Sequence, residues 1–507
     1  MKIKEKATSI NLKKGISLIV LVITIIVMII LASTIILSLS GVNIIEKANE
    51  AVRNHNRQQI ATVAQTIWSE GYLSNESKAS IKEKIVKEVG KNKAEDFNIV
   101  VTDLGVIVED FPEGWENSVS EIVNGVPIPK GFVISPYDGE NTVNEGLVIY
   151  ALTTQEIANG VYDITKTDTD KTHQDSLENR NQFVWVPVDR NTFSTEDDTE
   201  FKRDSFEWNI DGHYGTTDRN DNFYSNKLGS NNAEDKYFWE VELDDENMPN
   251  ATQNMNFMSS ATLDEVQAMY ASVKKYGGFY IARYEVGGTQ VQETTNFVRG
   301  TVSVTMGKKP YNGVPWATSN TMSFDEGGAV QLAREFYAKT NTNYGVVSTL
   351  TYGVQWDRTL AWIKSRKGES FNLLDSTEYG NYANTSLAVA DFNENAQYVS
   401  ATYNKDSATT GYYDVGTWTY VTNFTSRSGN YIMTTGALQK VNVCNIYDMA
   451  GNLLEWTMEG HSTDNRVHRG GIFDYYFGSS LPVASRNYNH PAAVSAGYGF
   501  RPSLYIK

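Results

Sequence analysis

The stretch Asn445-Ile-Tyr-Asp-Met-Ala-Gly-Asn-Leu-Leu-Glu-Trp-Thr457 decides the fold of the C-terminal part of this 507-residue chain. It predicts a tight turn at Gly451-Asn452, because glycine and asparagine adopt turn conformations that other residues avoid. The turn leads into a strand that carries Glu455 and Trp456. A glutamate buried in such a strand is expected to pair with a buried arginine.

Further short motifs flank this stretch in a fixed order. Upstream, the expected strands are Phe183–Val188 and Gly277–Glu285, and the expected helices are Ala329–Lys339 and a stretch near Gln355–Lys364. Downstream lie Arg466-Val-His-Arg-Gly-Gly471, where the two glycines let backbones approach closely, and Gly499-Phe-Arg501. Short strands, two helices and long aromatic-rich loops together predict an α+β domain.

This order of motifs resembles the formylglycine-generating enzyme, or sulfatase-modifying factor, family over about residues 183–507. The family's runs look like YDMAGNVWEWT, then RGGSW, then GFR. The resemblance implies a compact domain related to C-type lectins, with a small core sheet and long ordered loops. It implies scaffold roles for the motif residues, which are Gly451, Asn452, Glu455, Trp456, Arg469, Gly470, Gly471, Gly499, Phe500 and Arg501.

The same resemblance argues against catalysis. The family's oxidase chemistry uses two copper(I)-binding cysteines, the sixth and eleventh residues after the Arg of RGG. Counted from Arg469, these positions hold Tyr475 and Ser480, and the single cysteine, Cys444, is expected to be a small core residue. No two of the six histidines show the His-x3-His or His-x-Glu spacing of the superfamily's iron-binding branch. No catalytic residue and no required cofactor are therefore predicted. Calcium stays open without a site, and a metal-dependent oxidase is the disfavoured alternative.

The segment between RGG and GFR predicts a binding surface instead. It is rich in Tyr, Ser, Asn, Gly and Ala and poor in charge, the composition that antibody paratopes use. It also resembles the diversified C-terminal ends of the variable proteins of diversity-generating retroelements, where Asn codons change to Tyr, Ser, Asp, His, Gly and Ala. The predicted partner is a protein or glycan on another cell, and the predicted contact residues are Tyr475, Tyr476, Ser480, Asn487, Tyr488, Asn489, His490 and Tyr498.

The N-terminus predicts a membrane anchor. The run Ile16–Leu39 has no charged residue, and as a helix it would extend ~36 Å, enough to cross a bilayer core of ~30 Å. Lysines precede it and place that flank in the cytoplasm. The expected topology is a single pass through a bacterial cell membrane, with the C-terminal domain outside.

The leader Lys13-Lys14-Gly15 before Ile16 resembles a type IV prepilin signal, in which a peptidase cuts after the glycine. The family usually has Glu at the fifth mature position, where this chain has Val20, so two readings stay open. One is a processed pilin-like protein that meets prepilin peptidase and pilin-like subunits and is associated with pili. The other is an uncleaved anchor. A minor pilin with a structural role in filament assembly is accordingly the alternative function.

The predicted order of parts along the chain is simple. A leader (1–15) precedes a pilin-like helix (16–70), an α+β spacer (71–125), lead-in strands and loops (126–182) and the lectin-fold domain (183–507). In the spacer, Ser80 and Glu83 have capping-box spacing for a helix that Gly90 ends, and a hairpin follows over 97–108. The net charge of −17 argues against nucleic acid as a partner. The leading hypothesis is a surface-displayed, non-catalytic recognition protein.

Overall fold

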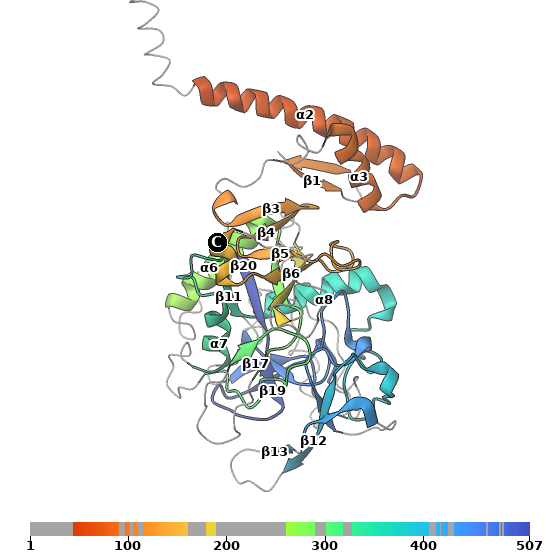
Figure 1. The fold of residues 1–507 in the computed structure, drawn as a ribbon, viewed down its shortest axis with the longest axis vertical. Helices are drawn as coiled ribbons and strands as arrows, with labels where there is room; N and C mark the ends of the chain where they lie inside the picture. Colours follow the sequence, from red (N-terminus) through yellow and green to blue (C-terminus); the bar gives the residue numbers. More distant parts are fainter. Residues whose placement is uncertain are drawn as a thin grey trace, which may run out of the picture. The chain divides into compact units, whose positions relative to one another are not determined.

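The structure is a computed structural model. It describes residues 44–90, 97–101, 105–109, 115–160, 179–188, 260–288, 301–317, 327–404, 412–415, 417–423, 430–462, 465–475, 478 and 481–507. They form two compact units, one ending at Phe111 and one beginning at Pro112. The sequence predicted an α+β fold, and the described residues combine helices and strands, with a β-rich C-terminal unit (Figure 1).

The first unit packs two helices on a hairpin. Its elements are α2 (Ile44–Leu73), α3 (Lys78–Val89), β1 (Asn98–Val101) and β2 (Val106–Glu109), and the two strands pair antiparallel as the sequence predicted. Its core consists of Ile60, Ala64, Ile81, Ile85, Phe97 and Ile99. Apolar residues at helical spacing on α2 and α3 thus meet the inner face of the hairpin.

The predicted start of α3 was wrong by one turn. The N-cap is Ser77, whose Oγ accepts a hydrogen bond from the Ser80 backbone N–H at 3.2 Å. Ser80 lies inside the helix, and its hydroxyl donates to Glu76 at 3.0 Å. The end was predicted correctly, because Gly90 has a positive φ of 89° and its N–H bonds to the Val86 carbonyl.

The predicted membrane span at 16–39 lies outside the described residues, as do the processing residues Gly15 and Ile16. Among the residues that the structure does describe, no helix is both long and apolar enough to cross a bilayer. The pilin-like helix therefore stays a prediction.

The second unit is built on a six-stranded antiparallel sheet. Its strand order is β11 (Val346–Leu350), β20 (Pro502–Ile506), β8 (Gly278–Ala282), β7 (Gln182–Pro187), β6 (Val148–Ala151) and β5 (Phe132–Ile134). The strands β5 and β6 come from the stretch expected to be a separate lead-in, yet β6 pairs directly with β7. That stretch is part of the domain's central sheet. A hairpin of β3 (Val119–Val123) and β4 (Val126–Pro129) precedes it.

In the described residues of this unit, three longer helices pack around the sheet. The sequence predicted two, found as α7 (Gly328–Phe336) and α8 (Gly353–Lys367), and missed α6 (Ser260–Tyr276). Helix α6 packs on β8 and β20, α7 packs on β11, and α8 contacts β7 and β16. The short helices are α5 (Thr154–Asn159), η1 (Trp115–Asn117), η6 (Gly368–Ser370), η7 (Val389–Asp391), η8 (Val421–Asn423) and η9 (Gln439–Val441).

Two smaller sheets complete this unit. One has the order β18 (Arg486–Asn489), β17 (Asn465–Arg469), β16 (Leu454–Ser462) and β19 (Tyr498–Phe500), with β19 parallel to β16. The other joins β12 (Gln397–Asn404) to β13 (Tyr412–Val415), β14 (Thr419–Tyr420) and β15 (Tyr431–Met433). A minimal pair consists of β9 (Gly287–Gly288) and β10 (Val302–Ser303). Figure 1 shows β12 and β13 at the end of this unit opposite β3 and β4.

Candidate functional site

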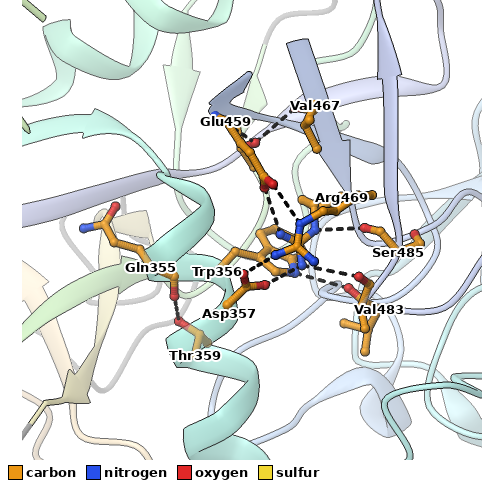
Figure 2. Close-up of polar contacts among 12 residues, drawn as sticks. Gln355, Trp356, Asp357, Thr359, Glu459, Val467, Arg469, Val483 and Ser485 are labelled. Carbon is orange, nitrogen blue, oxygen red and sulfur yellow. Dashed lines mark hydrogen bonds and ion pairs between the residues drawn. The ribbon is translucent and has the colours of Figure 1, made fainter. Parts of the chain in front are cut away.

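The sheet β18-β17-β16-β19 carries the RGG and GFR motifs, and a buried ion network lies against it. Arg469 of β17 contacts Asp357 of α8 at 2.6 Å and Glu459 of β16 at 3.1 Å (Figure 2). Arg486 of β18 completes the network, with Nε 2.7 Å from Glu459 and a second bond to Asp357. Two guanidinium groups and two carboxylates balance in charge, which a buried cluster requires.

This network ties three strands to one helix. The Nε of Arg469 donates to the Ser485 carbonyl at 2.8 Å, and the Trp356 indole N–H donates to the Val483 carbonyl at 3.2 Å (Figure 2). Arg486 is the first residue of β18, so its bonds to the two carboxylates hold the start of this strand in place. The backbone from 483 to 486 is thus held by side chains of α8, β16 and β17.

The glycines of the RGG motif allow a close approach, as predicted. Gly471 has φ 83°, and a Cβ on it would lie 2.3 Å from the Leu481 carbonyl oxygen. Gly470 has φ 94°, and a Cβ there would lie 2.9 Å from the Met449 carbonyl oxygen. Neither position has room for a side chain. The two glycines therefore let the chain after β17 pack closely against the backbone at Leu481 and Met449.

The turn and strand of the opening stretch form the second polar centre. Arg501 binds Glu455 through two bonds, of 2.9 and 2.7 Å, which confirms the predicted buried pair. The Asn452 side-chain amide donates to Glu285 and also accepts from the Met433 N–H at 2.9 Å. The predicted turn is present, since Gly451 and Asn452 have φ of 72° and 56°.

Three buried carboxyl groups meet one guanidinium in this centre. Burial raises the pKa of Glu285 well above its ordinary value, and the charges of Asp448 and Glu455 raise it further. Burial raises the pKa of Asp448 to about 7, although the Gly436 N–H and Arg501 lower it. Burial raises the pKa of Glu455 too, against the opposing effect of Arg501. The excess of acidic groups therefore favours protonated carboxyls in the folded state.

The predicted contact residues fall on two neighbouring parts of this unit. Asn487, Tyr488 and Asn489 form β18 and are partly exposed, and His490 follows them with an exposed side chain. Tyr498 begins β19, and its hydroxyl accepts a hydrogen bond of 2.7 Å from the Asn489 amide. That bond connects residues of the two edge strands of the four-stranded sheet.

Tyr475 and Tyr498 pack on the same group of buried apolar side chains. Both are partly buried and pack on a second hydrophobic core, which consists of Val399, Ile432, Leu453, Leu454, Ile472, Phe473, Leu481 and Ala496. Trp418 packs on the same core, and Lys309 lies 5.6 Å from the centre of its ring. Trp418 was not predicted to have a role, although it lies in an aromatic-rich stretch. Tyr476 and Ser480 lie outside the described residues.

The loop between β18 and β19 is fixed by a distant segment. The N–H groups of Gly313 and Ala317 donate to the carbonyls of Ser495 and Pro491, at 3.1 and 3.2 Å. The side-chain amide of Asn312 donates to the Ala496 carbonyl at 2.8 Å. These three bonds use backbone oxygens of the loop, and the side chains of His490 and Ser495 add two more, as acceptors from the Ala492 and Gly497 N–H groups at 3.2 and 3.1 Å.

His468 lies beneath this surface as a neutral imidazole. It is 1 % exposed, and its ring centre lies 4.7 Å from that of Tyr498 and 5.0 Å from that of Trp456. Both ring nitrogens are buried without a hydrogen-bond partner. Burial lowers the pKa of His468 to about 3.

Cys444 is buried, as expected of a core residue, and burial raises the pKa of its thiol. It has a φ of 51° and packs within the main hydrophobic core. Within the described residues, no group of three or more His, Cys, Asp or Glu side chains is arranged to hold a metal ion. Calcium binding stays a prediction without an assigned site.

Comparison with known proteins supports the C-terminal resemblance. Residues 254–503, just under half of the chain, match the family model described as the sulfatase-modifying factor enzyme 1-like domain. The match begins later than the predicted boundary at 183 and includes every motif from Gly277 to Arg501. No curated protein matches the chain.

Proposed function

We propose that the domain similar to sulfatase-modifying factor enzyme 1 serves here for recognition, without catalysis, and binds a partner through the surface of residues 470–501. One observation carries this proposal. The first of the two positions where the family's oxidase chemistry needs a cysteine holds Tyr475, whose ring packs on the second core. A phenol packed on apolar side chains cannot replace a copper-binding thiolate.

The construction of the surface supports binding. The ion network of Asp357, Glu459, Arg469 and Arg486 fixes its base, and the segment 312–317 fixes the loop that follows β18. A surface whose backbone is already ordered loses little conformational entropy when a partner binds. Partly exposed tyrosine and asparagine side chains then supply contact area and adaptable hydrogen bonds.

The same construction supports targeted diversification. Backbone bonds from residues 312–317 and the buried arginines hold the segment, so substitution of its partly exposed side chains leaves these contacts in place. We propose that this segment is diversified as in the variable proteins of retroelements. The test is genomic: the proposal requires a near-copy of the DNA for residues 470–501 beside a reverse-transcriptase gene, and it fails without one.

Display outside a bacterial cell is proposed from the sequence. The apolar run 16–39 would anchor the chain, and Gly15-Ile16 would be the processing site. Intact mass measurement of the chain from its native membrane separates the two readings. A mature N-terminus at Ile16 supports a pilin-like precursor, whereas full-length protein supports a plain anchor.

The direct test of function is a screen of the full chain against cell-surface glycans and proteins. The double variant Tyr488→Ala/His490→Ala removes two accessible side chains of the surface. Because contact residues at the centre of an interface each contribute more than ~1.4 kcal/mol, we expect at least a tenfold weaker binding of the identified partner. The matched control is Tyr420→Ala, a tyrosine 56 % exposed outside this surface. Equal binding by the double variant and the control would reject the assignment of the surface.

A further inference from the structure

Strand β18 is an edge strand with an open side. It pairs with β17 through Arg466↔Asn489, Val467↔Tyr488, His468↔Asn487 and Arg469↔Arg486. It stands first in the order of its sheet, and in the described part of the chain no strand pairs with its other side. A row of unpaired backbone N–H and C=O groups on such an edge is a template for pairing with another strand.

Two side chains occupy the donors of this open edge. The Tyr488 N–H donates to Asn487 Oδ1 at 2.8 Å, and the His490 N–H donates to Asn489 Oδ1, also at 2.8 Å. The two N–H groups are two residues apart, so they point to the same side of the strand. In an antiparallel strand the N–H groups of consecutive residues point to opposite sides. Since the N–H groups of Tyr488 and His490 point away from β17, those of Asn487 and Asn489 point toward it. The outward N–H groups of Tyr488 and His490 are thus each capped by the asparagine that precedes them.

Proline, lysine and a bulge, three usual protections of an edge, are missing from this strand. Its sequence Arg-Asn-Tyr-Asn has no proline and no lysine, and its pairing with β17 has no register shift. Its one charged residue, Arg486, is buried in the ion network and cannot repel a second strand. The protections that this strand does have are its length of four residues and the two asparagine caps.

Asn489 is held in its capping conformation at both ends of its amide. Its Oδ1 accepts from the His490 N–H, while its Nδ2 donates to the Tyr498 hydroxyl. The cap is therefore connected to β19 on the opposite edge of the sheet, and it is an ordered part of the fold.

We propose that Asn487 and Asn489 close the β18 edge against strand addition, and that without them a second copy of this chain pairs there, β18 against β18. Two identical edges run antiparallel across a two-fold axis, so the backbone N–H groups of each edge can donate to the carbonyls of the other. The Oδ1 atoms of these asparagines then serve the backbone, and the partner of the intact surface reaches it through side chains. This inference does not depend on the proposed recognition function.

The test is the self-association of the purified full chain in one mild detergent, followed by size-exclusion chromatography with light scattering. We expect Asn487→Ala/Asn489→Ala to dimerise at least tenfold more tightly than the unaltered chain. The matched control Asn487→Asp/Asn489→Asp keeps both acceptor oxygens and is expected to behave like the unaltered chain. Adding Tyr488→Pro to the alanine pair removes one uncapped donor and should reverse the dimerisation.

The same idea is tested without any substitution by amide hydrogen exchange of the unaltered chain. The Tyr488 and His490 amides should exchange slowly, since each is hydrogen-bonded. The proposal is overturned if these two amides exchange as fast as unstructured ones. It is equally overturned if the folded alanine pair associates no more strongly than the aspartate pair.

Discussion

At the scale of single residues, the charge balance of the buried ion network determines how strongly a substitution in it destabilises the fold. Arg469 contacts both carboxylates, Asp357 and Glu459, and its side chain is fully buried. Removing one member leaves a charge in the interior without its counter-charge, whereas the intact network satisfies all four groups. The arginine of the RGG motif is therefore a structural requirement of the surface that it supports.

We expect Arg469→Met to destabilise the chain by about 3–5 kcal/mol, because two buried carboxylates would then share one guanidinium. Urea denaturation of the full chain measures the change. Arg366→Met is the control, since Arg366 is exposed and a surface substitution changes stability by about 0.5 kcal/mol or less. Equal stability of the two variants would contradict the structural role of the network.

The buried imidazole of His468 predicts a specific response to acid. Its folded pKa of about 3 lies below the ordinary value of 6.5, so folding favours the neutral form. The stability that this neutral form contributes is present above pH 6.5 and is lost as the pH falls toward 3. We expect the advantage of the unaltered chain over His468→Leu to shrink below pH 6, by up to about 1.4 kcal/mol per pH unit.

Unfolding free energies in urea between pH 4 and pH 8 check this expectation. Asp448 has the opposite sign, because its raised folded pKa of about 7 contributes stability at low pH that is lost as the pH rises through 7. The comparison with His468→Leu isolates the histidine, since both chains keep Asp448. Parallel curves for the two chains would show that the imidazole is not buried in its neutral form.

At the scale of elements, the connection after β17 depends on two glycines. We expect Gly471→Ala to destabilise the chain by more than Gly307→Ala. Both glycines have a positive φ, which costs a non-glycine residue about 1–3 kcal/mol. Only Gly471 adds a steric clash, with a Cβ 2.3 Å from the Leu481 carbonyl, whereas Gly307 faces open space. Thermal or urea unfolding of the two variants measures the difference, and an equal loss would contradict the close packing of this connection.

The elements that the sequence predicted well are those with a local signal. The hairpin of β1 and β2, the helices α7 and α8 and the turn at Gly451-Asn452 each follow from nearby glycines, periodicity or β-branched runs. Helix α6 was missed because its flanking sequence is polar and its apolar residues were not assigned to a face. The cap of α3 was misplaced because Ser80 has the glutamate three residues later that the capping-box rule requires, whereas Ser77, the N-cap in the folded helix, has Ser80 at that position.

The candidate site was predictable only in part. The Glu455–Arg501 pair followed from motif residues, but Arg486, Asp357 and Glu459 were not found, since nothing local distinguishes a buried charge from an exposed one. The predicted ligand role of Asn487 and Asn489 overlooked their bonds to the backbone. Such bonds depend on which side of β18 pairs with β17, and sequence spacing does not reveal that.

At the scale of the whole molecule, the absence of family cysteines at 475 and 480 makes a prediction about metal content. The purified full chain, reconstituted with copper(I) under reducing conditions and then dialysed, should retain no stoichiometric copper, because Tyr475 and Ser480 offer no thiolate. Elemental analysis by mass spectrometry measures this. One copper per chain, retained by the unaltered protein and lost from Cys444→Ala, would contradict this prediction and support the alternative of a metal-dependent oxidase.

We propose that the surface of residues 470–501 recognises a partner on another cell. The most direct measurement is the attachment of cells that display the full chain to partner cells, compared with cells that display Tyr475→Ala/Tyr476→Ala/Tyr488→Ala at equal density. We predict that the triple variant loses attachment at least tenfold, as the removal of central aromatic contacts requires. Unchanged attachment by a folded triple variant would show that this surface does not carry recognition.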